Sequence, residues 1–245
     1  MSRVASIVFR SAFLLLASLG SLGATGALAS TDVGSINFTA GYKNLTSDWN
    51  LDQLQYDVYG QPLPQDRALQ PALGLETTWG RKAWPVHVAF DIQNSSDDGL
   101  WHVPAFFTEP AYDLRLRANV LEVGLGARRA FDLKWITPYL GAGGLWARAK
   151  VEVDVSDPNS GQFGTPTGHG HARSSSLGYW VGGGLYRRLG PRFQMGVAYR
   201  YSKATLDAKP FTVDSGSIPS NTGFPAVDGG GRTINFIVGW SYPSH

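Results

Sequence analysis

Eight segments of the chain alternate apolar and polar residues one by one, and this alternation limits the possible folds more than any other feature. In the segment at 232–242 the apolar residues share one face; they are Ile234, Phe236, Val238, Trp240 and Tyr242. A period of two is the period of a β-strand, and no stretch of helical periodicity separates the segments. The pattern therefore predicts an all-β protein, an eight-stranded antiparallel transmembrane β-barrel with lipid outside and a polar lumen.

The N-terminus has the composition of an export signal. Arg3 and Arg10 precede an apolar run at 12–17, and small residues follow up to Ala27-Leu28-Ala29. A basic start, a short apolar run and an A-x-A site are typical of a cleavable signal peptide. We expect residues 1–29 to be removed and residues 30–245 to form one barrel domain in the outer membrane. The alternative, an uncleaved membrane helix, would need a longer apolar run.

Composition limits the chemistry and the partners that the chain can have. The chain has no cysteine, so it can form neither disulfides nor thiolate sites. It has 21 basic and 19 acidic residues, and the signal holds two of the basic and none of the acidic ones. The mature chain is therefore neutral, which gives no support for nucleic-acid binding.

The predicted strands are joined by short and long connections in turn. We expect strands at 33–42, 70–79, 84–92, 116–128, 135–155, 176–187, 192–205 and 232–242. The second, fourth and sixth strands are followed by short basic turns, whereas the long connections at 43–69, 93–115, 156–175 and 206–231 are rich in acids. Short periplasmic turns and long outer loops are usual in such barrels, and an even strand number places both termini in the periplasm. Leu114 and Leu116 are out of phase with Leu121, which predicts either a bulge in the fourth strand or a bend of that strand above the membrane.

The strand phases also predict charged residues in the lumen. The expected network comprises Glu76, Asp91, Glu122, Arg148 and Arg200, and Lys150 and Glu152 share the phase of Arg148. Charges in a narrow barrel are costly unless they are paired. The network therefore predicts either a plug that closes the lumen or a gate that passes small solutes.

The run Pro138-Tyr139-Leu140-Gly141-Ala142-Gly143-Gly144 and the final strand Asn235-Phe236-Ile237-Val238-Gly239-Trp240 belong to the same pattern. With them, residues 31–242 resemble the small OmpA-like and OmpW-like outer-membrane barrels. Members of these families usually end on Phe or Trp, whereas this chain continues to His245, so we expect its assembly signal to lie further inward.

From the pattern as a whole we expect a monomer with a structural or surface-interaction role, at most limited small-solute passage, no cofactor and no enzymatic activity. Its implied partners are outer-membrane lipid, lipopolysaccharide and, during insertion, the barrel-assembly machinery. OmpA-like relatives imply an internal Glu–Arg network. OmpW-like relatives imply an alternative, a narrow channel for small hydrophobic molecules with a pocket lined by Trp146 and Trp180.

The histidines offer one further alternative. If the chain is extended there, His169, His171, Arg173 and Ser175 share a face, and outer-membrane lipid A deacylases use a His/Ser/acid set on a barrel of this size. Those enzymes place His and Ser two residues apart on a strand, a spacing that His171 does not have to a serine. Zn²⁺ or Cu²⁺ at His169 and His171 would lack a third ligand in the sequence. We therefore expect solvated loop histidines and neither a catalytic nor a metal site.

Overall fold

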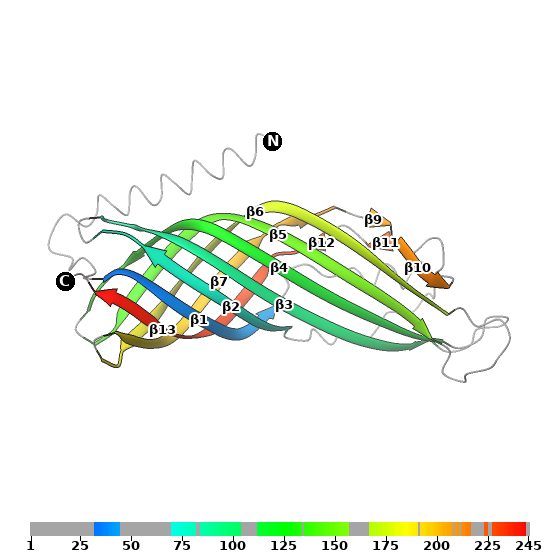
Figure 1. The fold of residues 1–245 in the computed structure, drawn as a ribbon, viewed down its shortest axis with the longest axis horizontal. Coiled ribbons are helices and arrows are strands. Elements are labelled where there is room, and N and C mark those ends of the chain that lie inside the picture. Colours follow the sequence, from blue (N-terminus) through cyan, green and yellow to red (C-terminus); the bar gives the residue numbers. More distant parts are fainter. Residues whose placement is uncertain are drawn as a thin grey trace.

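A computed structural model describes residues 32–44, 70–81, 84–103, 112–133, 135–156, 167–190, 192–207, 209–210, 212–216, 223–224 and 227–243. Eight strands form a closed antiparallel barrel (Figure 1). They are β1 (Asp32–Asn44), β2 (Gln70–Trp79), β3 (His87–Val103), β4 (Tyr112–Ala130), β5 (Thr137–Ser156), β6 (Gly168–Arg188), β7 (Phe193–Lys203) and β13 (Gly231–Pro243). Each strand pairs with the next, and β13 pairs with both β7 and β1. The predicted fold class and strand number are confirmed, whereas the predicted signal at 1–29 lies outside the described residues.

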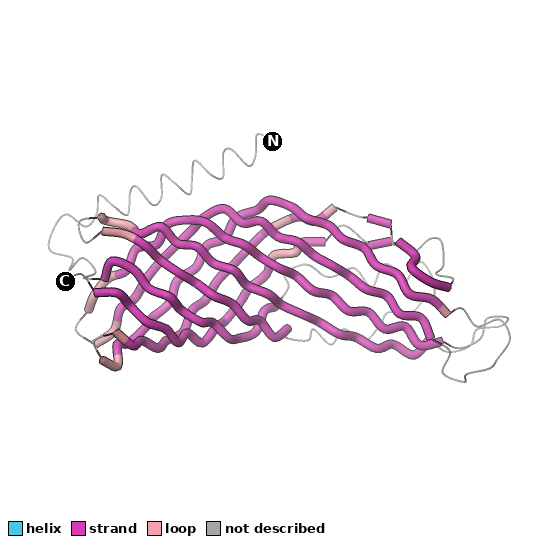
Figure 2. The backbone as a smooth tube through the Cα atoms, viewed as in Figure 1, coloured by secondary structure: helices cyan, strands magenta, loops and turns pink. Residues whose placement is uncertain are grey.

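The wall of the barrel is taller along β3 to β6 than along β1 and β2, as the right-hand side of Figure 1 shows. β6 has 21 residues and β2 has 10. Figure 2 shows continuous strand along this tall wall. Residues 168–175, predicted as loop, therefore belong to β6. Of the two explanations predicted for the phase of β4, the bulge is wrong, because the pairing of β4 with β5 runs from Asp113 to Ala130 without a register shift.

Two faces with opposite character result from the alternation. In β13 the outward Ile234 and Phe236 are 65% and 62% exposed, while the inward Thr233 and Asn235 are buried. Exposed apolar side chains of this size around a closed barrel form a surface that suits lipid and not water. The predicted phases of β1, β7 and β13 are therefore confirmed. The described residues contain no helix with the length and apolarity needed to cross a membrane.

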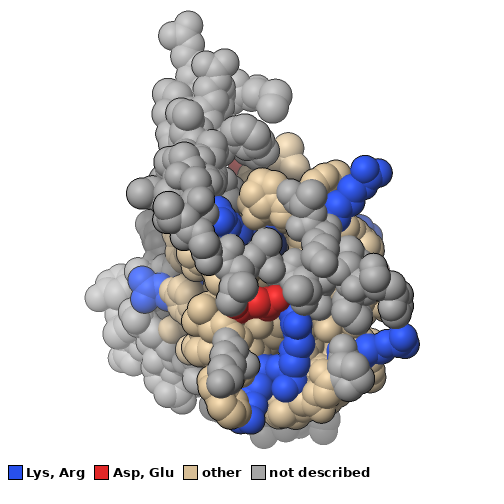
Figure 3. Space-filling view, turned by 90° about the vertical axis from the view of Figure 1, so that its left-hand side faces the viewer, with Lys and Arg blue, Asp and Glu red and all other residues tan. Residues whose placement is uncertain are grey.

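One end of the barrel carries the short turns, a belt of aromatic side chains and many basic side chains. Trp79, Trp84, Trp135 and Trp240 are exposed there, and Trp240 makes edge contacts with Phe38 and Phe193. Aromatic side chains of this kind favour the interface between lipid and water. Figure 3 looks onto this end and shows Lys and Arg side chains at several places around its rim. One of the acidic side chains, Asp132, accepts a hydrogen bond from Arg188 at 3.1 Å.

At the other end, the connection between β7 and β13 folds back onto the barrel. It forms five short strands: β8 (Thr205–Leu206), β9 (Lys209–Pro210), β10 (Thr212–Gly216), β11 (Gly223–Phe224) and β12 (Val227–Asp228). β8 pairs with β12, β9 with β11, and β10 with the outer end of β6. Part of the predicted open loop at 206–231 is therefore ordered sheet against the barrel.

Apolar side chains fill much of the lumen. Near the outer end Leu206, which is 0% exposed, packs with Val120, Ala149, Val151 and Ala172. Closer to the middle, Trp180 packs with Ala89, Leu145, Ala147 and Ala204. Tyr139, Tyr186 and Ile237 form a third cluster toward the short turns. Between and beside these clusters lie the charged residues of the lumen.

Candidate functional site: the charged lumen

The charged residues of the lumen form two layers. The layer nearer the outer end, called here the upper charge layer, is centred on the carboxylate of Glu122. Its Oε1 accepts hydrogen bonds from Lys43 Nζ at 2.5 Å and from Ser202 Oγ at 3.0 Å. Its Oε2 lies 3.5 Å from Arg200 Nη2. The side chains of Lys43 and Glu122 are each 1% exposed, so both charges are almost fully removed from water. Such charges are tolerated in a protein interior only when they are paired.

Arg200 crosses the lumen from β7 and completes this layer. Its Nη1 donates to Asp91 Oδ1, and its guanidinium lies 5.2 Å from the ring centre of Trp180. Asp91 fits because Gly124 stands opposite it in the register; a Cβ at Gly124 would lie 2.2 Å from Asp91 Oδ2. The upper layer therefore holds two cations and two carboxylates in one connected set.

A lower charge layer lies toward the short turns. Arg128 and Glu76 form an ion pair, and Asn37 Nδ2 donates to Glu76 Oε1 at 3.1 Å. Gln194 Nε2 in turn donates to Asn37 Oδ1 at 2.6 Å. The Arg128 guanidinium lies 4.1 Å from the ring centre of Tyr139, a cation–π contact. This layer joins β1, β2, β4, β5 and β7 across the lumen.

Four of the five residues predicted for the lumen network, Glu76, Asp91, Glu122 and Arg200, lie in these two layers. The placement of Arg148 is wrong, because it is exposed on the outer wall of β5, and the partly exposed Lys150 and Glu152 face outward with it. The lumen positions of β5 belong instead to the odd residues, among them Ala147, Ala149 and Val151. Trp146 also faces outward, so it forms no lumen pocket with Trp180.

The physical reason is that the rule of a polar lumen and an apolar exterior holds only where the wall meets lipid. β5 continues beyond that zone. There the outer wall faces water and carries the charges, while the interior is closed by alanines, valines and Leu206.

Sequence reasoning missed two charged residues of these layers, Lys43 and Arg128. Lys43 was placed in the connection at 43–69 and Arg128 was the last residue of the predicted strand at 116–128, but both strands extend further than expected. The alternation already contained this information. In β1, Lys43 has an odd residue number like the inward-facing Asn37 and Thr39, and in β4, Arg128 has an even number like the inward-facing Glu122.

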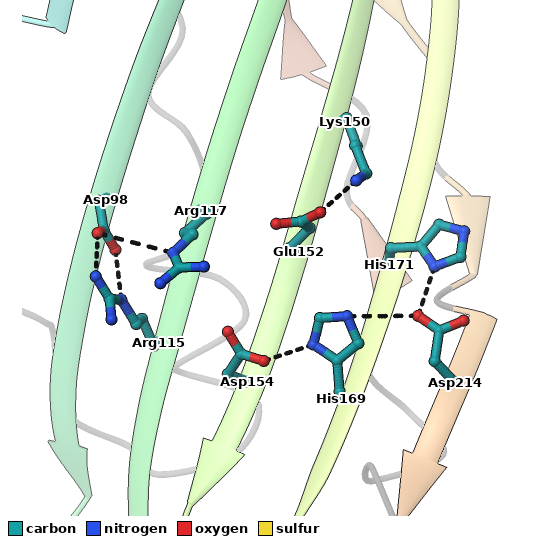
Figure 4. A network of polar contacts seen from close by, with 9 residues as sticks. All are labelled: Asp98, Arg115, Arg117, Lys150, Glu152, Asp154, His169, His171 and Asp214. Atoms are coloured by element: carbon teal, nitrogen blue, oxygen red, sulfur yellow. Dashed lines mark hydrogen bonds and ion pairs between the residues drawn. The ribbon is translucent and has the colours of Figure 1, made fainter.

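A second polar network lies on the outer wall of the tall side (Figure 4). Arg115 Nε donates to Asp98 Oδ1 at 2.9 Å, and Arg117 Nε lies 3.8 Å from Asp98 Oδ2. Lys150 pairs with Glu152 on β5. These charged side chains share the outward face of three neighbouring strands.

The histidines belong to the same wall. His169 Nδ1 lies 2.5 Å from Asp154 Oδ1, and His171 Nδ1 lies 2.7 Å from Asp214 Oδ2. His169 Nε2 is 3.6 Å from the same Asp214 oxygen. Both histidines are partly exposed to solvent, but their predicted place in a loop is wrong, because they stand on β6 and contact Asp214 of β10. Within the described residues, no three His, Cys, Asp or Glu side chains are arranged to hold a metal ion.

Contacts on this wall lower the pKa of three of its carboxyl groups. The hydrogen bond from Arg115 lowers the pKa of Asp98, and that from Lys150 lowers the pKa of Glu152. The pKa of Asp214 is lowered chiefly by its hydrogen bond with His171 and also by the nearby charge of Arg173. At neutral pH the outer wall therefore presents ionised groups of both signs.

Comparisons with known proteins give likenesses of architecture. No family model matches the chain, and no curated protein matches it by sequence. Neisserial surface protein A has a similar structure at 17% identity and a TM-score of 0.44, with 88% of this chain and 99% of that chain covered. Ail of Yersinia pestis, in complex with the heparin analogue sucrose octasulfate, is similar at 13% identity and a TM-score of 0.41, with 85% and 96% covered.

The N-terminal β-barrel domain of Pseudomonas aeruginosa OprF is similar at 11% identity and a TM-score of 0.37, with 85% of this chain and 97% of that chain covered. These likenesses concern the architecture alone. The predicted eight-stranded antiparallel barrel is confirmed by the closed strand pairing of the chain itself.

Proposed function

We propose that the protein is a bacterial outer-membrane barrel with a structural or surface-interaction role, whose lumen is closed to all but limited passage of small solutes. The observation that carries the proposal is the filling of the lumen along its described length. Leu206 and its apolar neighbours occupy the outer part, and the two charge layers follow. Tyr139, Tyr186 and Ile237 pack toward the short turns.

Energetics favour a plug over a freely moving gate. A path through the upper layer would separate Lys43 from Glu122, which are both nearly inaccessible to water. Breaking a buried ion pair costs about 3–5 kcal/mol when one charge is left without its partner. A pore that opened by this route would be populated only rarely at equilibrium.

The exterior supports the proposed location and partners. Exposed apolar side chains are distributed over all eight strands of the barrel. A surface of this kind suits a monomer surrounded by outer-membrane lipid, with lipopolysaccharide in the outer leaflet and the assembly machinery as a partner during insertion. We propose no enzymatic role, because His171 and Ser175 stand four residues apart on the extended strand β6, too far for a hydrogen bond between them.

Single-channel recording of the refolded mature chain in planar bilayers tests the closed lumen. We expect no stable open level from the wild type. Arg200→Ala, which leaves Asp91 without its cation, should admit water and produce a small conductance. The matched control is Arg232→Ala on the exposed outer face of β13, which should stay silent. A stable wild-type conductance that Arg200→Ala does not alter would overturn the proposal.

One observation favours a second function, a narrow channel for small hydrophobic molecules. The buried side chains of Val151, Val153 and Val155 make the outer part of the lumen apolar. The side chain of Leu206 packs inside it, in the space that a small apolar ligand would occupy. On this alternative, Leu206→Ala would create space for a fluorescent apolar probe and the wild type would release Leu206 to bind it. Probe binding by Leu206→Ala alone would mark a packing cavity and reject the channel.

A further inference from the structure

Three cations form an exposed patch on the outer wall of β5 and β6. Arg148 and Lys150 are alternate residues of β5, and Lys150 stands opposite Arg173 of β6 in the register. Arg148 and Arg173 are exposed, and the Lys150 side chain is 40% exposed. Paired strands are about 4.8 Å apart and alternate residues about 7 Å apart, so the three charged groups can reach one polyvalent ligand. We call these residues the basic patch.

The basic patch directly follows the apolar surface of the barrel. The residue pair next to it on the membrane side is Trp146 with Leu177. Both face outward, and they are 37% and 75% exposed. A tryptophan followed by Arg and Lys is the order found where acyl chains give way to headgroups.

Acidic side chains are absent from the two register rows that hold the patch, within the described strands β4 to β6. One row is Leu121, Arg148 and Ser175, and the next is Asn119, Lys150 and Arg173. The carboxylates begin with Glu152, one outward position further from the membrane, and Glu152 pairs with Lys150. Among the described residues no carboxylate lies within ion-pair distance of Arg148 or Arg173. The wall is therefore basic next to the lipid and mixed in sign above it.

We propose that the basic patch binds the phosphate groups of the lipid part of lipopolysaccharide in the outer leaflet. This inference rests on the proposed outer-membrane location. Guanidinium groups form paired hydrogen bonds with phosphate oxygens, and the ammonium of Lys150 adds a point charge. Trp146 and Leu177 would contact the acyl chains of the same molecule, which a soluble polyanion lacks. The combination of cations and adjoining apolar side chains selects a phosphorylated lipid.

Native mass spectrometry of the refolded mature chain in detergent can test the site with lipid A as the probe. The test variant is Arg148→Gln/Lys150→Gln/Arg173→Gln. The matched control is Arg81→Gln/Arg187→Gln/Arg192→Gln, which removes three exposed charges from the opposite end of the barrel. Folding of each variant is verified by its heat-modifiable gel migration, and the single variant Arg148→Glu serves if the triple variant does not fold.

We expect the wild type and the control to bind bisphosphorylated lipid A more tightly than dephosphorylated lipid A. The test variant should lose about fivefold in affinity for each charge removed. The proposal is overturned if the test variant keeps wild-type affinity or if the two lipid forms bind equally. It is also overturned if a soluble heparin oligosaccharide binds the patch as tightly as lipid A, since that identifies a general polyanion site. Channel activity does not affect this readout, so a conducting lumen would contradict the proposed function and leave the lipid site standing.

Discussion

Replacing Lys43 with methionine removes the cation closest to the most buried carboxylate of the lumen. Lys43 Nζ lies 2.5 Å from Glu122 Oε1 and also donates to the carbonyl oxygen of Gly229 at 3.0 Å. Methionine retains most of the side-chain volume, so the change isolates the charge. Glu122 keeps its hydrogen bond from Ser202 and an Arg200 nitrogen at 3.5 Å.

The expected loss follows from these remaining contacts. Removing one partner of a buried pair costs about 3–5 kcal/mol, and the remaining contacts of Glu122 place Lys43→Met near 3 kcal/mol. Glu122→Gln leaves Lys43 without a counter-charge, so its cost falls in the same range of about 3–5 kcal/mol. The double variant removes both charges and should be about 1–3 kcal/mol more stable than the sum of the two losses predicts.

Urea unfolding in lipid vesicles, followed by tryptophan fluorescence, measures the four corners of this cycle. Lys203→Met is the control, since Lys203 is exposed on the outer face of β7 and its loss should change stability little. If the two single losses add to within about 0.5 kcal/mol in the double variant, the residues are not coupled and the reasoning is refuted.

Three further predictions concern the exterior. Val197→Arg or Val238→Arg on the lipid face should lower the free energy of unfolding by about 2–4 kcal/mol, whereas lumen-facing Ala198→Ser should change it little; equal stabilities would contradict the assigned faces. Protease added to intact cells should cut within 45–69 and spare the bond after Arg188, and the reverse pattern would invert the topology. The pKa of Asp214 is lowered from 3.8, so its carboxylate stays ionised above that pH. The contact between Asp214 of β10 and His171 of β6 should therefore persist there and weaken only as pH falls through the lowered pKa. Hydrogen exchange of 212–216 measures this, and Asp214→Asn should abolish the pH dependence.

The sequence was sufficient to predict the membrane-embedded part of the barrel. β2 begins and ends where expected, and β7 and β13 present the predicted faces. In that zone lipid and lumen impose opposite polarity on successive residues, so the alternation is strong. Four of the five predicted lumen charges follow from the same alternation.

Above the membrane the same reasoning failed, because both sides of the wall change character. Arg148 was placed inside since polar residues were equated with the lumen, yet the outer extension of β5 has water outside and packed valines inside. Leu206 lies in the lumen because it packs against residues of β4, β5 and β6. The sequence around 204–207 alone does not predict these contacts. The link between His171 and Asp214 joins residues 43 positions apart and needed the pairing of β10 with β6.

The central claim is that the tall wall is closed inside and charged outside, and labelling along β5 tests it most directly. The chain has no cysteine, so single substitutions introduce unique thiols. On intact cells, a membrane-impermeant maleimide should label Arg148→Cys and Lys150→Cys and leave Ala147→Cys and Ala149→Cys unlabelled. Labelling of the second pair would contradict a closed lumen, and protection of the first pair with labelling of the second would place the charges of β5 inside the barrel.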